Sequence, residues 1–138
     1  MIKFKDQIKK LFNQYKEIVC PAFLDEKIVF NAKGINHLIY KGNRSRREES
    51  RILANIRLLP RAVKMLLVMP LWQEENSYTK DGVLYKFWCF EAVVDDRRIK
   101  AMVRHVGNGR NHFWSVIPAW REDRYGMVNA KNRNLEGE

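Results

Sequence analysis

The sequence predicts an α+β fold in which N-terminal helices pack on one face of a four-stranded antiparallel meander sheet. Its 138 residues are the usual length of a single domain. As far as Leu71 the apolar residues recur with a helical period, and beyond it they alternate as in strands with one buried face. Helices first and consecutive strands second favour α+β over α/β. We assign residues 1–120 to one helix-plus-sheet domain and residues 121–138 to a polar tail.

The first half of the chain predicts two short elements after an opening helix. Phe4 to Val19 places apolar residues at helical spacing beneath a lysine-rich side, and Pro21 is expected to end this helix. A short strand is expected at Ile28–Phe30, and a short helix at Ile35–Tyr40.

The strongest helical pattern follows these elements. Ser45 and Glu48 have the spacing of a capping box, and apolar residues then fall on one face as far as Leu66. Pro60 lies inside this pattern, so it either kinks one long helix or begins a second helix.

The second half predicts four strands joined by short turns. Alternating residues and turn signals place them at Trp72–Tyr78, Val83–Val94, Ile99–Val106 and Asn111–Pro118. If the turns lie where we place them, one face is apolar and is expected beneath the helices: Trp88, Phe90, Ala92, Val94, Ile99, Ala101, Val103, Trp114 and Val116. A slip of one residue would exchange the two faces.

The opposite, open face mixes aromatic residues with cations. Arg104 is expected between Phe87 and Phe113, with Ser115 nearby, and an arginine among aromatic rings is a platform for a stacked base and its phosphate. An exposed sheet with a cation–π pair is the simpler interpretation. Lys100 is expected opposite Glu91 as a cross-strand ion pair.

The charge of the chain is uneven and predicts a polyanionic partner. The formal net charge is +10, and residues 33–64 hold nine basic and two acidic residues. Such clustering attracts phosphates, so RNA is the expected partner and DNA the alternative. No apolar run is long enough for a membrane span, and two isolated cysteines favour a reducing, cytoplasmic location.

Histidines supply the candidate acid–base groups. His37 precedes a cationic stretch that contains Lys41, Arg44, Arg46 and Arg47. A base beside cations is what RNA cleavage by the ribose 2′-hydroxyl requires, although packing between Ile35 and Leu38 would explain His37 as well.

A second histidine pair is expected across the turn at Gly107–Gly109. His105 and His112 would be cross-strand neighbours there, with Lys86 adjacent, either as an acid–base pair or as two histidines at a sheet edge. The sequence has no zinc-ligand spacing and no carboxylate cluster, so any catalysis is expected to need neither metal nor cofactor.

The order of elements resembles the barnase–EndoU–colicin–RelE-like nucleases, especially the compact versions that phages and mobile elements encode. The matching pieces are Ile35–Lys41, Leu58–Pro60, Asp81-Gly82 and Phe113–Pro118, within residues 28–118. The resemblance implies a metal-independent ribonuclease. It implies His37, Arg104 and Ser115 as first active-site candidates, supported by Lys41 and His105.

Three interpretations of function follow. The first is a metal-independent endoribonuclease, acting as a toxin or phage-borne effector. The second is a non-catalytic RNA- or DNA-binding module in which helix arginines contact phosphates: Arg46, Arg47, Arg51, Arg57 and Arg61. The third, compatible with the first, is a domain whose basic face binds a small acidic protein such as an antitoxin.

Overall fold

The structure is a computed structural model that describes residues 4–41 and 45–118, with only the backbone of Lys41, Ser45 and Arg46. The predicted tail at residues 121–138 and the candidate Arg44 lie outside the described residues. The described part is α+β, as predicted: three helices and a six-stranded mixed sheet.

Helix α1 spans Phe4–Tyr15 and buries Ile8 and Phe12 on one side. It ends earlier than predicted, because Lys16 adopts a positive φ of 54° and the chain turns into strand β1. Val19, expected at the end of this helix, is instead 60% exposed.

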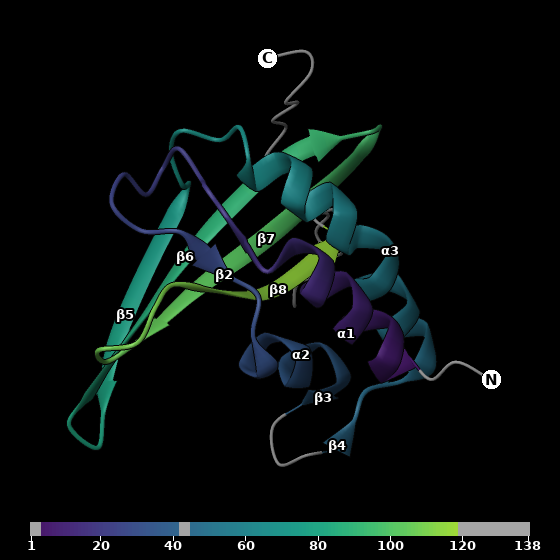
Figure 1. The fold of residues 1–138 in the computed structure, drawn as a ribbon, viewed down its shortest axis with the longest axis horizontal. Helices are drawn as coiled ribbons and strands as arrows, with labels where there is room; N and C mark the ends of the chain where they lie inside the picture. Colours follow the sequence, from purple (N-terminus) through teal and green to yellow (C-terminus); the bar gives the residue numbers. More distant parts are fainter. Residues whose placement is uncertain (1–3, 42–44, 119–138) are drawn as a thin grey trace, which may run out of the picture.

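Helix α2 spans Ala32–Ile39 and begins at the N-cap Asn31, whose side chain accepts a hydrogen bond from the Gly34 amide. Figure 1 shows α1 and α3 crossing one face of the sheet, while α2 lies beside strand β8.

Helix α3 spans Glu49–Leu66 and is continuous through Pro60, so the proline does not begin a second helix. The predicted capping box is wrong: the N-cap is Glu48 without a side-chain bond, and Ser45 belongs to a strand. Strands β3 (Tyr40–Lys41) and β4 (Ser45–Arg46) pair with each other as a separate two-stranded sheet.

The main sheet has the strand order β1-β2-β8-β7-β6-β5. Its strands are β1 (Glu17–Ile18), β2 (Ile28–Val29), β5 (Glu74–Lys80), β6 (Val83–Val94), β7 (Arg97–Val106) and β8 (His112–Pro118). The prediction of four antiparallel strands is therefore wrong in detail, because β1 and β2 extend the sheet and β2 runs parallel to β8. Strands of two residues are too short to show a period of their own.

Two-residue turns set the register of the long strands. Asp81 and Gly82 join β5 to β6 with φ of 53° and 77°, and Asp95 and Asp96 join β6 to β7 with φ of 50° and 64°. Left-handed turns of this kind match the twist of a hairpin. Trp88 is therefore opposite Val103, and both belong to the face that is predicted to be apolar.

The core lies between the helices and the face of the sheet that carries Trp88 and Val103, which we call the covered face. Phe12 of α1 makes edge-to-face contacts with Phe30 and Phe113, whose rings are stacked on each other with centroids 5.3 Å apart. Aromatic burial of this kind is a large part of what holds the helices to the sheet.

A β-bulge in β8 changes the predicted faces. Met102 is opposite Ser115, but the next pair is Val103 with Phe113, so Trp114 is an extra residue. Phe113 consequently points into the core with 0% exposure, and the prediction that it lies on the open face is wrong. Trp114, predicted to lie in the core, packs against side chains of the open face.

Candidate nucleic-acid interface

A cluster of aromatic and cationic side chains forms on the open face where α2 meets β8. The ring of Trp114 is stacked with the His37 imidazole, with ring centroids 3.8 Å apart and an interplanar angle of 19°. The Arg104 guanidinium carbon lies 3.5 Å from the centroid of the same Trp114 ring. Two groups this close to one ring would overlap on a single face, so His37 and Arg104 cover opposite faces of Trp114.

His112 fixes the position of Arg104. The Arg104 Nε donates a hydrogen bond to His112 Nε2 over 3.0 Å, which requires that nitrogen to be unprotonated. The proton of the neutral ring is then on Nδ1, which lies 3.3 Å from the Arg110 carbonyl oxygen. Burial, and then the charge of Arg104, lower the pKa of His112 to about 4, so the acceptor form persists at neutral pH.

His37 is also neutral at pH 7, because it is partly buried and three arginine charges act on it. Burial and the charges of Arg47, Arg104 and Arg51 lower its pKa to about 4. At neutral pH one ring nitrogen is therefore free to accept a proton, and the low pKa makes this imidazole a weak base. The same three guanidinium groups contribute positive charge at this corner of the molecule.

Two hydrogen bonds from side chains to backbone carbonyls of α2 hold this helix where His37 can reach Trp114. Arg47 Nε donates to the His37 carbonyl over 2.9 Å, and Asn55 Nδ2 donates to the Leu38 carbonyl over 3.0 Å. At Gly34 a Cβ atom would lie 2.3 Å from the Phe113 carbonyl oxygen, so only glycine allows α2 this close to β8.

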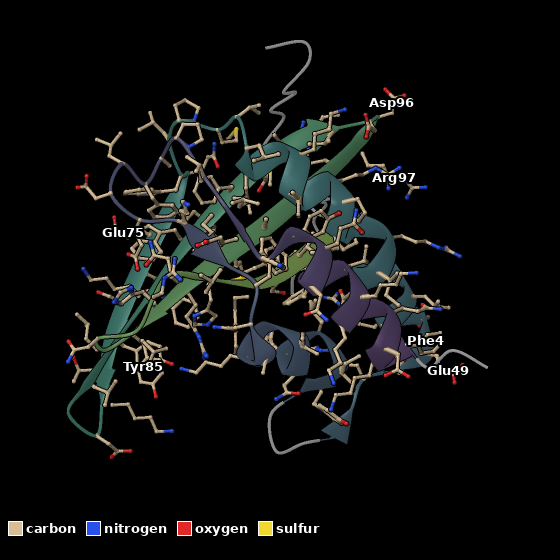
Figure 2. All side chains as sticks on the ribbon, viewed as in Figure 1. Phe4, Glu49, Glu75, Tyr85, Asp96 and Arg97 are labelled. Carbon is tan, nitrogen blue, oxygen red and sulfur yellow. The ribbon has the colours of Figure 1, made fainter. Side chains whose placement is uncertain are left out.

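Three aromatic residues continue the open face towards the β5–β6 turn. The rings of Tyr78 and Tyr85 are stacked with centroids 5.0 Å apart, and Tyr78 is also stacked with Phe87 at 5.9 Å. Phe87 is directly opposite Arg104 on the neighbouring strand. Figure 2 shows Tyr85 at this end of the sheet and Asp96 and Arg97 at the other.

Arg104 connects two aromatic groups. Its guanidinium contacts the Trp114 ring, and it interacts electrostatically with Tyr85 and Tyr78. Burial lowers the pKa of its guanidinium, and the nearby phenols of Tyr85 and Tyr78 act in the opposite direction. The guanidinium is half-buried on the open face, where a phosphate could approach it.

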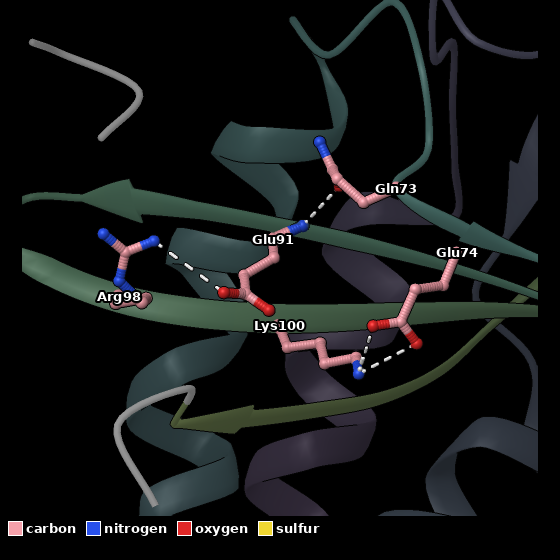
Figure 3. A network of polar contacts seen from close by, with 5 residues as sticks. All are labelled: Gln73, Glu74, Glu91, Arg98 and Lys100. Carbon is pink, nitrogen blue, oxygen red and sulfur yellow. Dashed lines mark hydrogen bonds and ion pairs between the residues drawn. The ribbon is translucent and has the colours of Figure 1, made fainter. Parts of the chain in front are cut away.

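Farther along the open face, Lys100 is part of a polar network (Figure 3). Lys100 is directly opposite Glu91, as predicted, but its ammonium group lies 3.2 and 3.3 Å from the two carboxylate oxygens of Glu74, so the predicted ion pair with Glu91 is wrong. Glu91, 3% exposed, lies 3.7 Å from Arg98 instead, and its backbone N–H donates to Gln73 Oε1 over 2.8 Å. Lys100 is thus charge-neutralised and is a weaker phosphate candidate than Arg104.

Lys100 also lines a hollow of about 720 Å³ that extends from the aromatic residues along the open face. Asn76, Phe87 and Met102 line it together with Lys100 and Glu74. A surface hollow of this size beside stacked rings can hold a nucleobase.

His105 lies on the opposite face of the sheet from Arg104, because neighbouring strand residues alternate. Its Nδ1 lies 2.7 Å from Asn111 Oδ1 and its Nε2 lies 2.9 Å from the Gly107 carbonyl oxygen. The predicted cross-strand pairing of His105 with His112 is therefore wrong, since His112 is opposite Arg104. As predicted, Lys86 is opposite His105. His105 lines a separate hollow of about 420 Å³ on the covered side.

The remaining candidates are placed only in part. Ser115 is on the open face, as expected, but only 6% of it is exposed. Arg57 is exposed on α3, where its carbonyl oxygen accepts a bond of 3.5 Å from Arg61. The side chains of Lys41 and Arg46 lie outside the described residues.

Sequence reasoning missed the central role of Trp114 and the bond from Arg104 to His112. The sequence predicts Phe87 on the open face, but it predicts Tyr78 only as the last residue of a strand. A longer β5 would have placed Tyr78 opposite Tyr85. The bulge that exposes Trp114 leaves no signal in the order of residues.

Comparisons with protein-family models, curated proteins and solved structures found no match for this chain. The resemblance to the barnase–EndoU–colicin–RelE-like nucleases stays a prediction. In the part of the chain that the structure describes, no helix has the length and apolar character to cross a membrane. Residues 4–41 and 45–118 also contain no group of three histidine, cysteine or carboxylate side chains arranged to hold a metal ion.

Proposed function

We propose that this chain binds single-stranded RNA on the open face of its sheet and cleaves it without a metal ion. The observation that carries the proposal is the cluster in which neutral His37 and cationic Arg104 enclose Trp114, with Arg47 and Arg51 beside them. A proton acceptor surrounded by guanidinium groups is suited to a ribose hydroxyl next to a phosphate.

The aromatic residues support binding of an unpaired strand. Tyr78, Tyr85 and Phe87 offer ring faces for bases, and stacking contributes about 1–3 kcal/mol per base. Arg104 lies between these rings and His37, where it would contact the intervening phosphate. The net charge of +10 adds long-range attraction.

Cleavage would proceed by attack of the 2′-oxygen on the adjacent phosphorus. His37 takes the 2′-hydroxyl proton while the arginines stabilise the phosphorane charge. The bond from phosphorus to the 5′-oxygen breaks, and that oxygen takes a proton from solvent. The products are a 2′,3′-cyclic phosphate and a 5′-hydroxyl. A bound phosphate would raise the low pKa of His37 and make it a better base.

One observation favours a second candidate function, a non-catalytic RNA- or DNA-binding module. Among the described residues, His112 is committed to Arg104 and His105 is on the other face. Of the described histidines, this leaves His37 alone to transfer a proton on the open face. A cluster of this composition would still bind phosphates if it cleaved nothing.

The experiment incubates total RNA with the protein in EDTA and compares wild type with His37→Ala. His105→Ala is the matched control, because it removes the same ring from the covered face. We expect cleavage to fall at least about a hundredfold in His37→Ala, the usual size of a general-base contribution, and to persist in the control. Equal cleavage by both variants would refute the role of His37. Salt-dependent binding with intact RNA would select the second function.

The third interpretation, an acidic protein partner, remains a proposal compatible with the first function. The arginines that surround His37 would meet its carboxylates. Co-expression and co-purification with a small acidic protein, lost on charge reversal at Arg104, would test it.

A further inference from the structure

Strand β5 is an edge of the main sheet, and its outer side carries no neighbour among the described residues. It is seven residues long, Glu74–Lys80, and residues 75–80 are exposed. A long exposed edge offers unpaired N–H and C=O groups to another strand.

Successive residues of a strand point their backbone N–H and C=O groups to opposite sides, and this alternation identifies which residues of β5 present these groups outward. The Gly107 amide donates to the Leu84 carbonyl over 2.8 Å, so Leu84 directs its backbone towards β7. Tyr85, the next residue, therefore directs its backbone towards Tyr78 on β5. It follows that Glu75, Ser77 and Thr79 point their N–H and C=O groups outward.

We propose that β5 pairs antiparallel with β5 of a second copy of this chain, centred on Ser77. In this register Ser77 is opposite Ser77 of the second copy, and Glu75 is opposite Thr79 of the second copy. The backbone N–H and C=O groups of all three outward-facing residues then form hydrogen bonds between the copies. Glu74 is opposite Lys80 of the second copy at both ends, which places opposite charges together on the open face. The contact is isologous, as expected for a two-fold dimer.

Like charges disfavour two of the neighbouring registers. Centring the pair on Glu75 places that carboxylate opposite its own copy, and moving the centre to Tyr78 places Glu75 opposite Asp81. Like charges directly opposite each other destabilise a strand pair. One strand pair buries little area, so the dimer is expected to dissociate on dilution.

Pairing would join the two open faces into one surface. Tyr78 and Asn76 would be cross-strand neighbours between copies, which brings the two Tyr78–Tyr85 stacks side by side. The inference rests on the edge itself and not on RNA binding, so the two can fail separately.

Single-cysteine variants of the full chain test both the contact and its register. In the proposed dimer the two Ser77 Cα atoms are about 5.5 Å apart, within disulfide range. Two Thr79 Cα atoms are about 14 Å apart, outside that range. Ser77→Cys should form a covalent dimer under mild oxidation at least about ten times faster than Thr79→Cys. Native Cys20 and Cys89 are buried, and wild type gives their background.

Light scattering during gel filtration supplies an independent measurement. We expect the measured molar mass to rise with protein concentration towards twice the 16.5 kDa mass of the chain. Ser77→Pro removes an outward N–H without removing a bond to β6, so it should abolish this rise. If it also unfolds the protein, the cysteine comparison decides. Equal cross-linking of both cysteine variants, or a monomer mass at every concentration, would overturn the proposal.

Discussion

Both faces of the main sheet carry aromatic residues, but in different surroundings. On the covered face Phe113 is fully buried between Phe12 and Phe30. One residue later, on the open face, Trp114 lies between an imidazole and a guanidinium. The difference shows that the neighbours of an aromatic ring, rather than the ring itself, separate a core residue from a candidate binding residue.

The histidines show the same contrast. His105 on the covered side has hydrogen-bond partners for both ring nitrogens. His112 on the open side accepts from Arg104, and His37 is held by stacking on Trp114. Only the open-face pair is linked to arginines that could bind a phosphate.

Truncating the two neighbouring aromatic residues should give the largest contrast between the faces. Phe113→Ala leaves a cavity in the core and should lower the free energy of unfolding by about 3–5 kcal/mol. Trp114→Ala removes a partly buried ring outside the core cluster, so it should cost less stability but weaken RNA binding more. Urea denaturation and fluorescence anisotropy with labelled RNA measure the two effects. Equal losses of stability would contradict the assignment of the faces.

Removing one positive charge from each face should give the next contrast. Arg104→Ala is expected to weaken RNA binding about tenfold and to reduce the salt slope by about one. Lys86→Ala removes the same charge on the covered face, where it is opposite His105, and should change affinity much less. Affinity titrations at several salt concentrations check this. The proposed interface is wrong if Lys86→Ala has the larger effect.

The smallest expected effect is a pH dependence that comes from the open face. An unfolded histidine titrates near 6.5, whereas the pKa of His37 is about 4 in the folded chain. The unfolded chain therefore binds more protons between these values, so the free energy of unfolding should fall as pH decreases from 6.5 to 4. His37→Phe keeps a ring on Trp114 without titrating. Urea denaturation at several pH values should show a shallower decline for it than for wild type, and parallel declines would contradict the assignment.

Much of the fold was predictable because local patterns decide it. The period of Ile52, Leu59 and Val63 indicated α3, and the turn at Asp95-Asp96 set the pairing of β6 with β7. The register of these two strands followed, since a two-residue turn leaves little freedom. That register also placed Arg104 and Phe87 opposite each other on the open face, as the structure has them.

Other features depended on contacts between distant parts of the chain. Strands β1 and β2 are too short for a pattern, and they form because β2 adds to the edge of β8. Lys100 binds Glu74 rather than its opposite neighbour, which only the lateral position of β5 makes possible.

By itself the sequence determined the α+β class, the three helical regions, the pairing of the long strands and the excess of positive charge. These depend on the spacing of neighbouring residues and on simple composition. Only the tertiary structure decided that β8 bulges, which sends Phe113 inward and Trp114 outward. It also decided that α2 approaches β8 through Gly34 closely enough to stack His37 on Trp114. A bulge and a close approach are fixed by packing across the whole core, and residues in linear order do not record that packing.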